Sequence, residues 1–201
     1  VILIGTIFTK RHLKLISEYK VPIVILGQKL EGYACVYQDE LHACQDLMEK
    51  MGRTAKEIAY VGVTQKDEAA GLGRKKGFDL ALKKMGKSCP AENRKEIAFQ
   101  MDAGYEAARE LIETNPGIDT IFCATDTIAV GVFVYLREQN IAVPDQIQLA
   151  GVGDTTIGRV MDPSLTSIHY FYKTSGKEAA RMMVELLENT DAVRKEIQMG
   201  Y

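Results

Sequence analysis

The stretch DTIFCATDTIAVGVFVYLREQNIAVPDQIQLAGVGD, residues 119–154, carries the pattern that decides the fold. It opens with an apolar run at 119–124, continues with a helical pattern from Asp126 to about Asn140, and returns to an apolar run at 147–152. Short continuous apolar runs are typical of strands buried on both faces, and a helix between two of them is typical of a parallel crossover. The stretch therefore predicts a strand–helix–strand unit of a parallel sheet.

The same alternation extends along the rest of the chain. It predicts the α/β class, with doubly wound parallel sheets, right-handed crossovers and helices on both faces. In such sheets ligands bind beyond the carboxyl ends of the strands, so the residues that follow each strand are the candidates for function. The other expected strands are 1–5, 22–26, 34–37, 57–62, 96–99, 165–170 and one from about 196, and the other expected helices are 10–19, 40–51, 68–85, 103–114 and 173–188.

Composition excludes some classes of function. The 201 residues are 46% hydrophobic and 26% charged, and the formal net charge is -2 with a pI near 6.0. A surface that grips DNA phosphates usually carries a basic stripe and a high pI, so this segment is not expected to bind DNA itself. The most basic stretch, residues 73–76, is short, lies in a helical pattern and is interpreted mostly as a solvated helix face.

The cysteines and histidines give no metal-binding pattern. Cys35, Cys44, Cys89 and Cys123 form no CxxC pair and have no histidine at ligand spacing, which favours reduced thiols and a cytoplasmic protein. His12, His42 and His169 are scattered, so no metal site is predicted. The sequence contains neither a signal peptide nor a long apolar run typical of a membrane span. The chain begins with an apolar run rather than with Met, which suggests that a preceding segment has been removed.

Motifs of catalysis and of nucleotide binding are missing from the sequence. No P-loop, GxSxG or HExxH occurs. The glycines at 71, 73 and 77 superficially resemble a dinucleotide loop, but they lie inside a helical pattern and their spacing is wrong. Gly151 and Gly153 do follow a strand, but no third glycine and no helix start follow them. We therefore predict no cofactor and no enzymatic activity.

Four short segments in order carry a resemblance to a known family. They are RKKGFDLAL at 74–82, ATDTIAVG at 124–131, VPDQI followed by AGVGD at 143–154, and DPSLTSI at 162–168. Together they resemble the effector domain of lactose/galactose-type repressors, in which RxxGF, a strand ending in xxD, VPxDI, GxxD and PxLTTI occur at these intervals. The resemblance covers nearly the whole chain.

The resemblance implies a periplasmic-binding-protein type of fold, in which two α/β lobes are joined by three crossing strands. The crossings are expected near 37–38, 167–170 and 198–201. The N-terminal lobe is then formed by residues 1–37 plus 171–197, and the C-terminal lobe by residues 38–170 plus 198–201. The N-terminal lobe is expected to be incomplete, because its first two strands and the helix-turn-helix before them are absent from this sequence.

The resemblance also implies which residues contact a ligand. Arg74 matches a ligand-contacting arginine, and a planar guanidinium offers paired donors to sugar hydroxyls; the alternative is a surface salt bridge. Asp126 either contacts ligand or caps its helix, and its neighbour Thr125 is the better candidate for a direct contact. Asp154 either reaches the site or caps its turn, and Gly153 stands where the family usually has a ligand-binding aspartate.

Three aromatic residues and a glutamine complete the predicted ligand site. Aromatic faces hold the C–H side of a sugar ring while polar groups fix its hydroxyls. Phe99 matches an aromatic position of the family pocket, and Tyr37 and Tyr172 lie near two crossings, although each could equally belong to a lobe core. Gln28, which follows the strand 22–26, is a weaker candidate.

The predicted function is effector sensing in a bacterial transcriptional repressor, with a sugar or sugar phosphate bound in the cleft between the lobes. Operator DNA is then a partner only through the absent helix-turn-helix, and a homodimer is expected because it suits two half-sites. The segments GVGD at 151–154 and HYFYKTSG at 169–176 look most like repressors of sucrose operons. Two alternatives stay open, a solute-binding protein of a sugar transporter and an α/β enzyme.

Overall fold

The computed structural model describes residues 1–189 and 191–201. They form two compact units that are described separately here. Unit 1 consists of residues 1–39, 67–69 and 170–201, and unit 2 of residues 40–66 and 70–169. The chain thus passes from unit 1 to unit 2 after Asp39, belongs to unit 1 again at residues 67–69, and returns to unit 1 at Tyr170.

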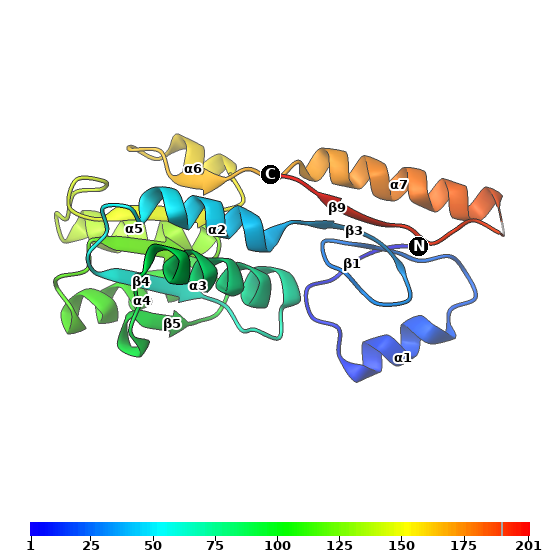
Figure 1. The fold of residues 1–201 in the computed structure, drawn as a ribbon, viewed down its shortest axis with the longest axis horizontal. Coiled ribbons are helices and arrows are strands. Elements are labelled where there is room, and N and C mark those ends of the chain that lie inside the picture. Colours follow the sequence, from blue (N-terminus) through cyan, green and yellow to red (C-terminus); the bar gives the residue numbers. More distant parts are fainter. Residues whose placement is uncertain (190) are drawn as a thin grey trace. The chain divides into compact units, whose positions relative to one another are not determined.

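Unit 1 is built on a parallel sheet in the order β1-β2-β3-β9. Helix α7 lies over one face of this sheet and α1 over the other (Figure 1). Val24, Val36 and Met182 lie in the core on the α7 side, and Ile16, Ile25 and Cys35 in the core on the α1 side. The elements of unit 1 are β1 (Ile2–Ile4), α1 (Lys10–Glu18), β2 (Val24–Leu26), β3 (Ala34–Gln38), α7 (Tyr172–Glu188) and β9 (Glu196–Met199).

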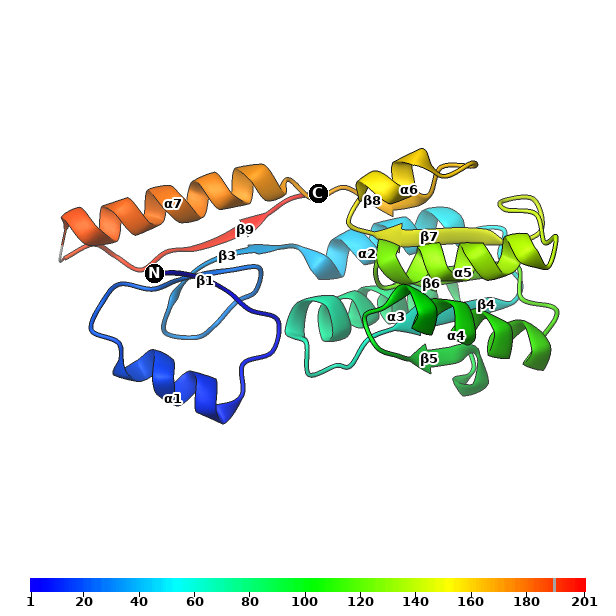
Figure 2. The same ribbon diagram turned by 180° about the vertical axis from the view of Figure 1, so that it is seen from behind.

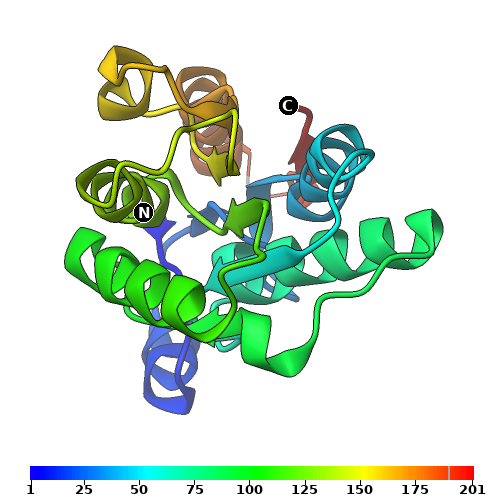
Figure 3. The ribbon, with the colours of Figure 1, turned by 90° about the vertical axis from the view of Figure 1, so that its left-hand side faces the viewer.

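Unit 2 is a five-stranded parallel sheet in the order β5-β4-β6-β7-β8, covered on both faces. Figure 2 shows α4 and α5 in front of the sheet, and Figure 3 shows the sheet end-on between that pair and the pair α2 and α3. The strands are β4 (Ile58–Gly62), β5 (Arg94–Glu96), β6 (Thr120–Cys123), β7 (Gln148–Val152) and β8 (Thr166–Ile168), and the helices are α2 (Glu40–Met51), α3 (Arg74–Met85), α4 (Met101–Thr114), α5 (Asp126–Glu138) and α6 (Thr156–Val160).

Alternation along β4 assigns its side chains to the two faces of the sheet of unit 2. Ala59 and Val61 pack in the core beneath α4 and α5, whereas Tyr60 contacts the ring of Phe78 on α3. The helix pair α4–α5 approaches closely because Gly131 has no side chain: a Cβ there would lie 1.9 Å from the carbonyl oxygen of Met101. Close packing on both faces makes this sheet a rigid support for the residues that follow its strands.

The predicted architecture, with parallel sheets and helices on both faces, is confirmed. Several details differ. The expected strand 96–99 is wrong by two to three residues, because the backbone pairs with β4 at 94–96. The expected helix 68–85 begins as a π-helical turn, Glu68–Gly73. Residues 198–201, expected in the second lobe, belong to unit 1, since β9 pairs with β3 as far as Met199.

Candidate functional site

The carboxyl ends of β4, β6, β7 and β8 bring together most of the predicted site residues of unit 2. Because these strands are parallel, the residues after them lie along one edge of the sheet. Thr125 and Asp126 follow β6, Asp154 follows β7, and His169 follows β8. Arg74 joins them, because α3 runs back along the sheet and begins at this edge.

Arg74 is held in a buried ion pair. Its Nε donates to Oε2 of Glu40 at 2.7 Å and its Nη2 to Oε1 at 3.1 Å, and both side chains are only 9% exposed. Nη1 donates to the carbonyl oxygen of Ala124 at 2.6 Å. The solvated helix face expected for residues 73–76 is therefore wrong at Arg74, and so is the alternative of a surface salt bridge. Contact between Arg74 and a ligand stays a prediction.

The carboxylate of Glu40 balances the buried charge of Arg74 at the point where the π-helical turn Glu68–Gly73 passes into α3. The π-helical turn before α3 brings its backbone against residue 64, where a Cβ on Gly71 would lie 2.0 Å from the carbonyl oxygen of Thr64. Gly71 is thus needed for this close approach, and it belongs to no dinucleotide loop.

Asp126 links three elements at the same edge. Its side chain is 1% exposed; Oδ2 accepts from the backbone N–H of Thr155 at 2.6 Å, and Oδ1 accepts from the Ser167 hydroxyl at 2.6 Å. The cap of α5 is Thr125, whose Oγ1 accepts from the N–H of Ile128 at 3.2 Å. Both carboxylate oxygens of Asp126 therefore hold the turn after β7 and strand β8 in place.

Asp154 carries two basic neighbours. Its carboxylate accepts from Nε of Arg159 at 2.7 Å and from Nη2 of the same residue, and it lies 2.7 Å from Nδ1 of His169. The hydrogen bond from Arg159 is the main cause that lowers the pKa of Asp154 to about 2, and His169 lowers it further. Gly153 has φ +133°, a conformation that glycine adopts without strain. The carboxylate of Asp154 is therefore oriented by the Arg159 guanidinium and the His169 ring, and it does more than cap its turn.

The low pKa of Asp154 can be tested directly. A carboxyl-carbon NMR titration should show Asp154 losing its proton near pH 2. Arg159→Gln should move this pKa upward, because the largest stabilising contact of the charged form is gone. Since the folded pKa lies below the unfolded one, the stability that this carboxylate contributes is present above about pH 4 and is lost as the pH falls toward 2. An unchanged titration in Arg159→Gln would contradict the assigned cause.

The predicted aromatic residue Phe99 is exposed. It lies in the loop after β5 and is 54% exposed. The aromatic rings of Tyr60, Phe78 and Phe122 are buried instead, with the centroids of Tyr60 and Phe78 4.8 Å apart. Phe99 is therefore available to a ligand, and its contact with one stays a prediction.

The candidates of unit 1 differ in exposure. Gln28 is 4% exposed, and its Nε2 donates to the carbonyl oxygen of Gly5 at 2.8 Å, which ties the loop after β2 to the loop after β1. Tyr37 is half-buried and packs in the core on the α1 side. Tyr172 is 54% exposed, and its ring meets that of Tyr170 edge-on at 5.8 Å. Of the three, Gln28 has the clearest structural role.

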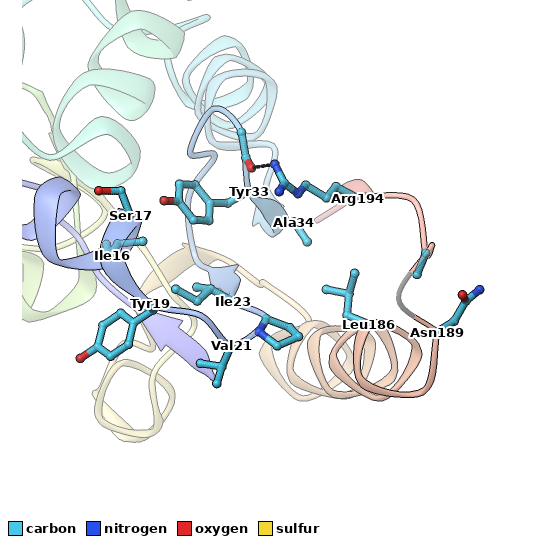
Figure 4. Close-up of a pocket in the computed structure, with 13 residues that line it drawn as sticks. Ile16, Ser17, Tyr19, Val21, Ile23, Tyr33, Ala34, Leu186, Asn189 and Arg194 are labelled. Atoms are coloured by element: carbon cyan, nitrogen blue, oxygen red, sulfur yellow. Dashed lines mark hydrogen bonds between the residues drawn. The ribbon is translucent and has the colours of Figure 1, made fainter.

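A pocket of about 550 Å³ lies in unit 1, near the amino ends of strands β2 and β3 (Figure 4). It is lined by Ile16 and Tyr19 at the end of α1, by the residues that lead into β2 and β3, and by Leu186 and Asn189 near the end of α7. Arg194 also lines it and donates from Nη1 to the carbonyl oxygen of Gly32 at 2.7 Å. None of the predicted ligand residues lines this pocket.

The four cysteines are distributed over both units. All four cysteines are free and buried, and burial raises the pKa of Cys44, Cys89 and Cys123. Across residues 1–189 and 191–201, histidine, cysteine, aspartate and glutamate side chains form no group of three that could hold a metal ion. The helices in that same part of the chain include none with the length and apolar character needed to cross a membrane.

Several residues of the site were missed from the sequence. Glu40 opens α2 after β3, Arg159 lies on α6, and Ser167 lies on β8. His169 directly follows β8, so the rule that selects residues after strands could have identified it. Glu40 and Arg159 act as partners of predicted residues, and nothing in periodicity reveals such pairs.

Comparison with known proteins shows the family of the chain and its similarity to transcriptional regulators. Residues 50–201 match the family described as "Periplasmic binding protein-like domain". The chain is 31% identical over 199 residues to HTH-type transcriptional regulator IdnR of Escherichia coli (strain K12), covering 96% of this chain and 58% of that protein. It is 32% identical over 186 residues to TreR of Salmonella typhimurium, covering 92% and 56%. The sucrose operon repressor of Staphylococcus xylosus is 24% identical over 94% of this chain and 58% of its own length.

Solved structures agree on the fold. The trehalose repressor from Escherichia coli is 26% identical, with a TM-score of 0.84 over 98% of this chain and 74% of that one. The CelR–cellobiose complex has a TM-score of 0.90 at 23% identity, over 99% of this chain and 62% of the other. The chain thus spans a little more than half the length of the curated relatives that it matches. Those relatives are transcriptional regulators rather than enzymes.

Proposed function

This chain belongs to the periplasmic-binding-protein-like family, with repressors of the lactose/galactose type as relatives, and from that premise we propose that it is the effector-sensing part of a transcriptional regulator. The effector is a sugar or a sugar phosphate. The observation that carries the proposal is the set of hydrogen-bonding side chains at the carboxyl edge of unit 2, where Arg74, Asp126 and Asp154 are held by buried or charged partners.

A preorganised polar edge suits a ligand rich in hydroxyls. Guanidinium and carboxylate groups fixed by their neighbours lose little freedom when a sugar binds, so more of the interaction energy appears as affinity. We propose that Arg74, Thr125, Asp154 and Phe99 of unit 2 contact the effector. Tyr37 and Tyr172 stay ligand contacts predicted from the sequence. Asp126 and Gln28 are proposed contacts that also support the site, because Asp126 holds the turn after β7 and strand β8 while Gln28 holds the loop after β1.

The names of the relatives favour disaccharides as probes. One solved relative is a trehalose repressor, another is a cellobiose complex, and one curated relative is a sucrose operon repressor. IdnR and TreR match this chain at higher identity than the sucrose operon repressor does, so sucrose is one probe among several. The named relatives are regulators, which does not favour the solute-binding alternative.

Operator DNA and a second copy of the chain are the proposed partners. A net charge of -2 and a pI near 6.0 do not favour phosphate binding by this segment, so we propose that DNA is bound through a part of the whole protein outside these residues. A homodimer suits an operator with two half-sites. Effector binding then needs only about 1–3 kcal/mol of coupling to alter operator affinity.

A thermal-shift panel tests the proposed effector class. The probes are trehalose, cellobiose, sucrose, fructose, their phosphates, hypoxanthine and common amino acids. A sugar at 100 times its Kd should stabilise the folded chain by about 2.7 kcal/mol, and each kcal/mol raises Tm by roughly 2–4 °C for a chain of this size. A clear shift with hypoxanthine alone would contradict the sugar assignment.

A further inference from the structure

The hydroxyl of Tyr60 is a buried donor without a partner. Tyr60 lies on β4, is 4% exposed, and within the described residues its hydroxyl oxygen makes no hydrogen bond. Buried polar groups are nearly always hydrogen-bonded, and each exception calls for an explanation. The packing of unit 2 gives none.

Phenylalanine would serve the core equally well at this position. The ring of Tyr60 packs 4.8 Å from that of Phe78 and 6.1 Å from that of Phe122, so its two aromatic neighbours lack a hydroxyl. An unpaired hydroxyl in this cluster costs free energy, which a phenylalanine would avoid. The oxygen atom is therefore better explained by a role outside the packing of the core.

The hydroxyl points along β4 toward the carboxyl edge. A Cβ placed on Gly62, two residues further along the strand and on the same face, would lie 2.7 Å from the Tyr60 oxygen. Gly62 is the last residue of β4, so this oxygen lies under the end of the strand. Burial raises the pKa of Tyr60, and the positive charge of Arg74 is close enough to oppose that effect. The unpaired hydroxyl of Tyr60 thus lies near the carboxyl ends of the strands of unit 2, where Arg74 also lies.

We propose that Tyr60 is a specificity-determining residue of the effector site, whose hydroxyl donates to an oxygen atom that arrives with the sugar, either a sugar oxygen or a water held by it. This inference rests on the proposed function. The donor is unpaired without effector and gains its partner on binding, so it favours ligands that place an acceptor beside Arg74. Sugars without that acceptor lose the hydrogen bond and bind less tightly.

Tyr60→Phe tests the inference because it removes one oxygen atom and leaves the ring in place. Tyr105→Phe is the matched control: its hydroxyl donates to Glu138 on the exposed side of α4 and α5. Trehalose, cellobiose and sucrose are the probes, titrated by calorimetry into the wild-type chain and both variants. We expect Tyr60→Phe to bind the tightest probe about 2- to 12-fold more weakly, to discriminate less among the three, and to melt at the same or a higher temperature.

The outcomes separate this inference from the proposed function. Loss of affinity and discrimination in Tyr60→Phe but not in Tyr105→Phe supports it. Equal affinity in wild type and Tyr60→Phe overturns it, whatever happens to Tm, and leaves the proposed function intact. A wild-type chain that binds none of the sugars of the wider panel overturns both.

Discussion

Replacing Arg74 with alanine is expected to lower the free energy of unfolding by about 3–5 kcal/mol, because it leaves the buried carboxylate of Glu40 without its partner. A residue on the surface of a helix that fills no core would be expected to leave folding nearly unchanged when it is replaced. The structure corrects this expectation: the guanidinium neutralises a carboxylate that is 9% exposed, and it also satisfies the carbonyl oxygen of Ala124.

Urea denaturation of the wild type and of Arg74→Ala, followed by circular dichroism, measures this loss. Lys75→Ala is the matched control, because Lys75 forms a partly exposed pair with Asp79 on the same helix, and such pairs contribute about 0–1 kcal/mol. The double variant Arg74→Met, Glu40→Leu should recover most of the stability, since a buried ion pair and apolar residues of similar volume are often equivalent. A loss below about 1 kcal/mol in Arg74→Ala would show that the pair is solvated.

The double variant also separates folding from ligand binding. It retains a packed core but no guanidinium, so a role of Arg74 in the site predicts about 10- to 150-fold weaker sugar binding. Calorimetric titration of the double variant with the sugar that binds the wild type measures this. Wild-type affinity in the double variant would remove Arg74 from the proposed contacts.

The fold of unit 2 was predictable because its central strands are buried on both faces. Runs such as Ile121–Ala124 are apolar throughout, and a run of this kind can be recognised without knowing which strands pair with it. Strand β5 was misplaced because it lies at the edge of the sheet and its residues, Arg94–Glu96, are polar, while the apolar residues 97–99 follow it. Helix α6 was missed because five residues provide no helical period.

The places of the candidate residues at the ends of strands were predictable from the sequence, but their hydrogen-bonding partners were not. The rule that ligands gather beyond the carboxyl ends of strands selected Asp126 and Asp154, and the family motif selected Arg74. Neither the rule nor the motif could show that Arg74 pairs with a residue 34 positions away, or that His169 contacts the carboxylate of Asp154. Such pairs depend on how segments fold together, and a single sequence does not record that.

Replacing Asp126 with alanine is expected to cost about 3–6 kcal/mol, from two hydrogen bonds to a buried carboxylate at roughly 1.5–3 kcal/mol each. Its loss leaves the N–H of Thr155 and the hydroxyl of Ser167 without their acceptor, and it loosens the turn that carries Asp154. Asp126→Asn should be intermediate, because its amide keeps one acceptor oxygen but presents a donor to the other contact.

Asp145→Ala is the control for Asp126→Ala, since Asp145 is an exposed aspartate of unit 2 and such substitutions usually change stability by less than about 0.5 kcal/mol. Urea denaturation gives the stabilities, and calorimetric titration of folded Asp126→Asn with the effector gives the affinity. Because both carboxylate oxygens are already bonded, we expect the larger effect on stability. A variant that folds as well as the wild type but binds sugar far more weakly would instead make Asp126 a direct ligand contact, and the turn after β7 would then need another support.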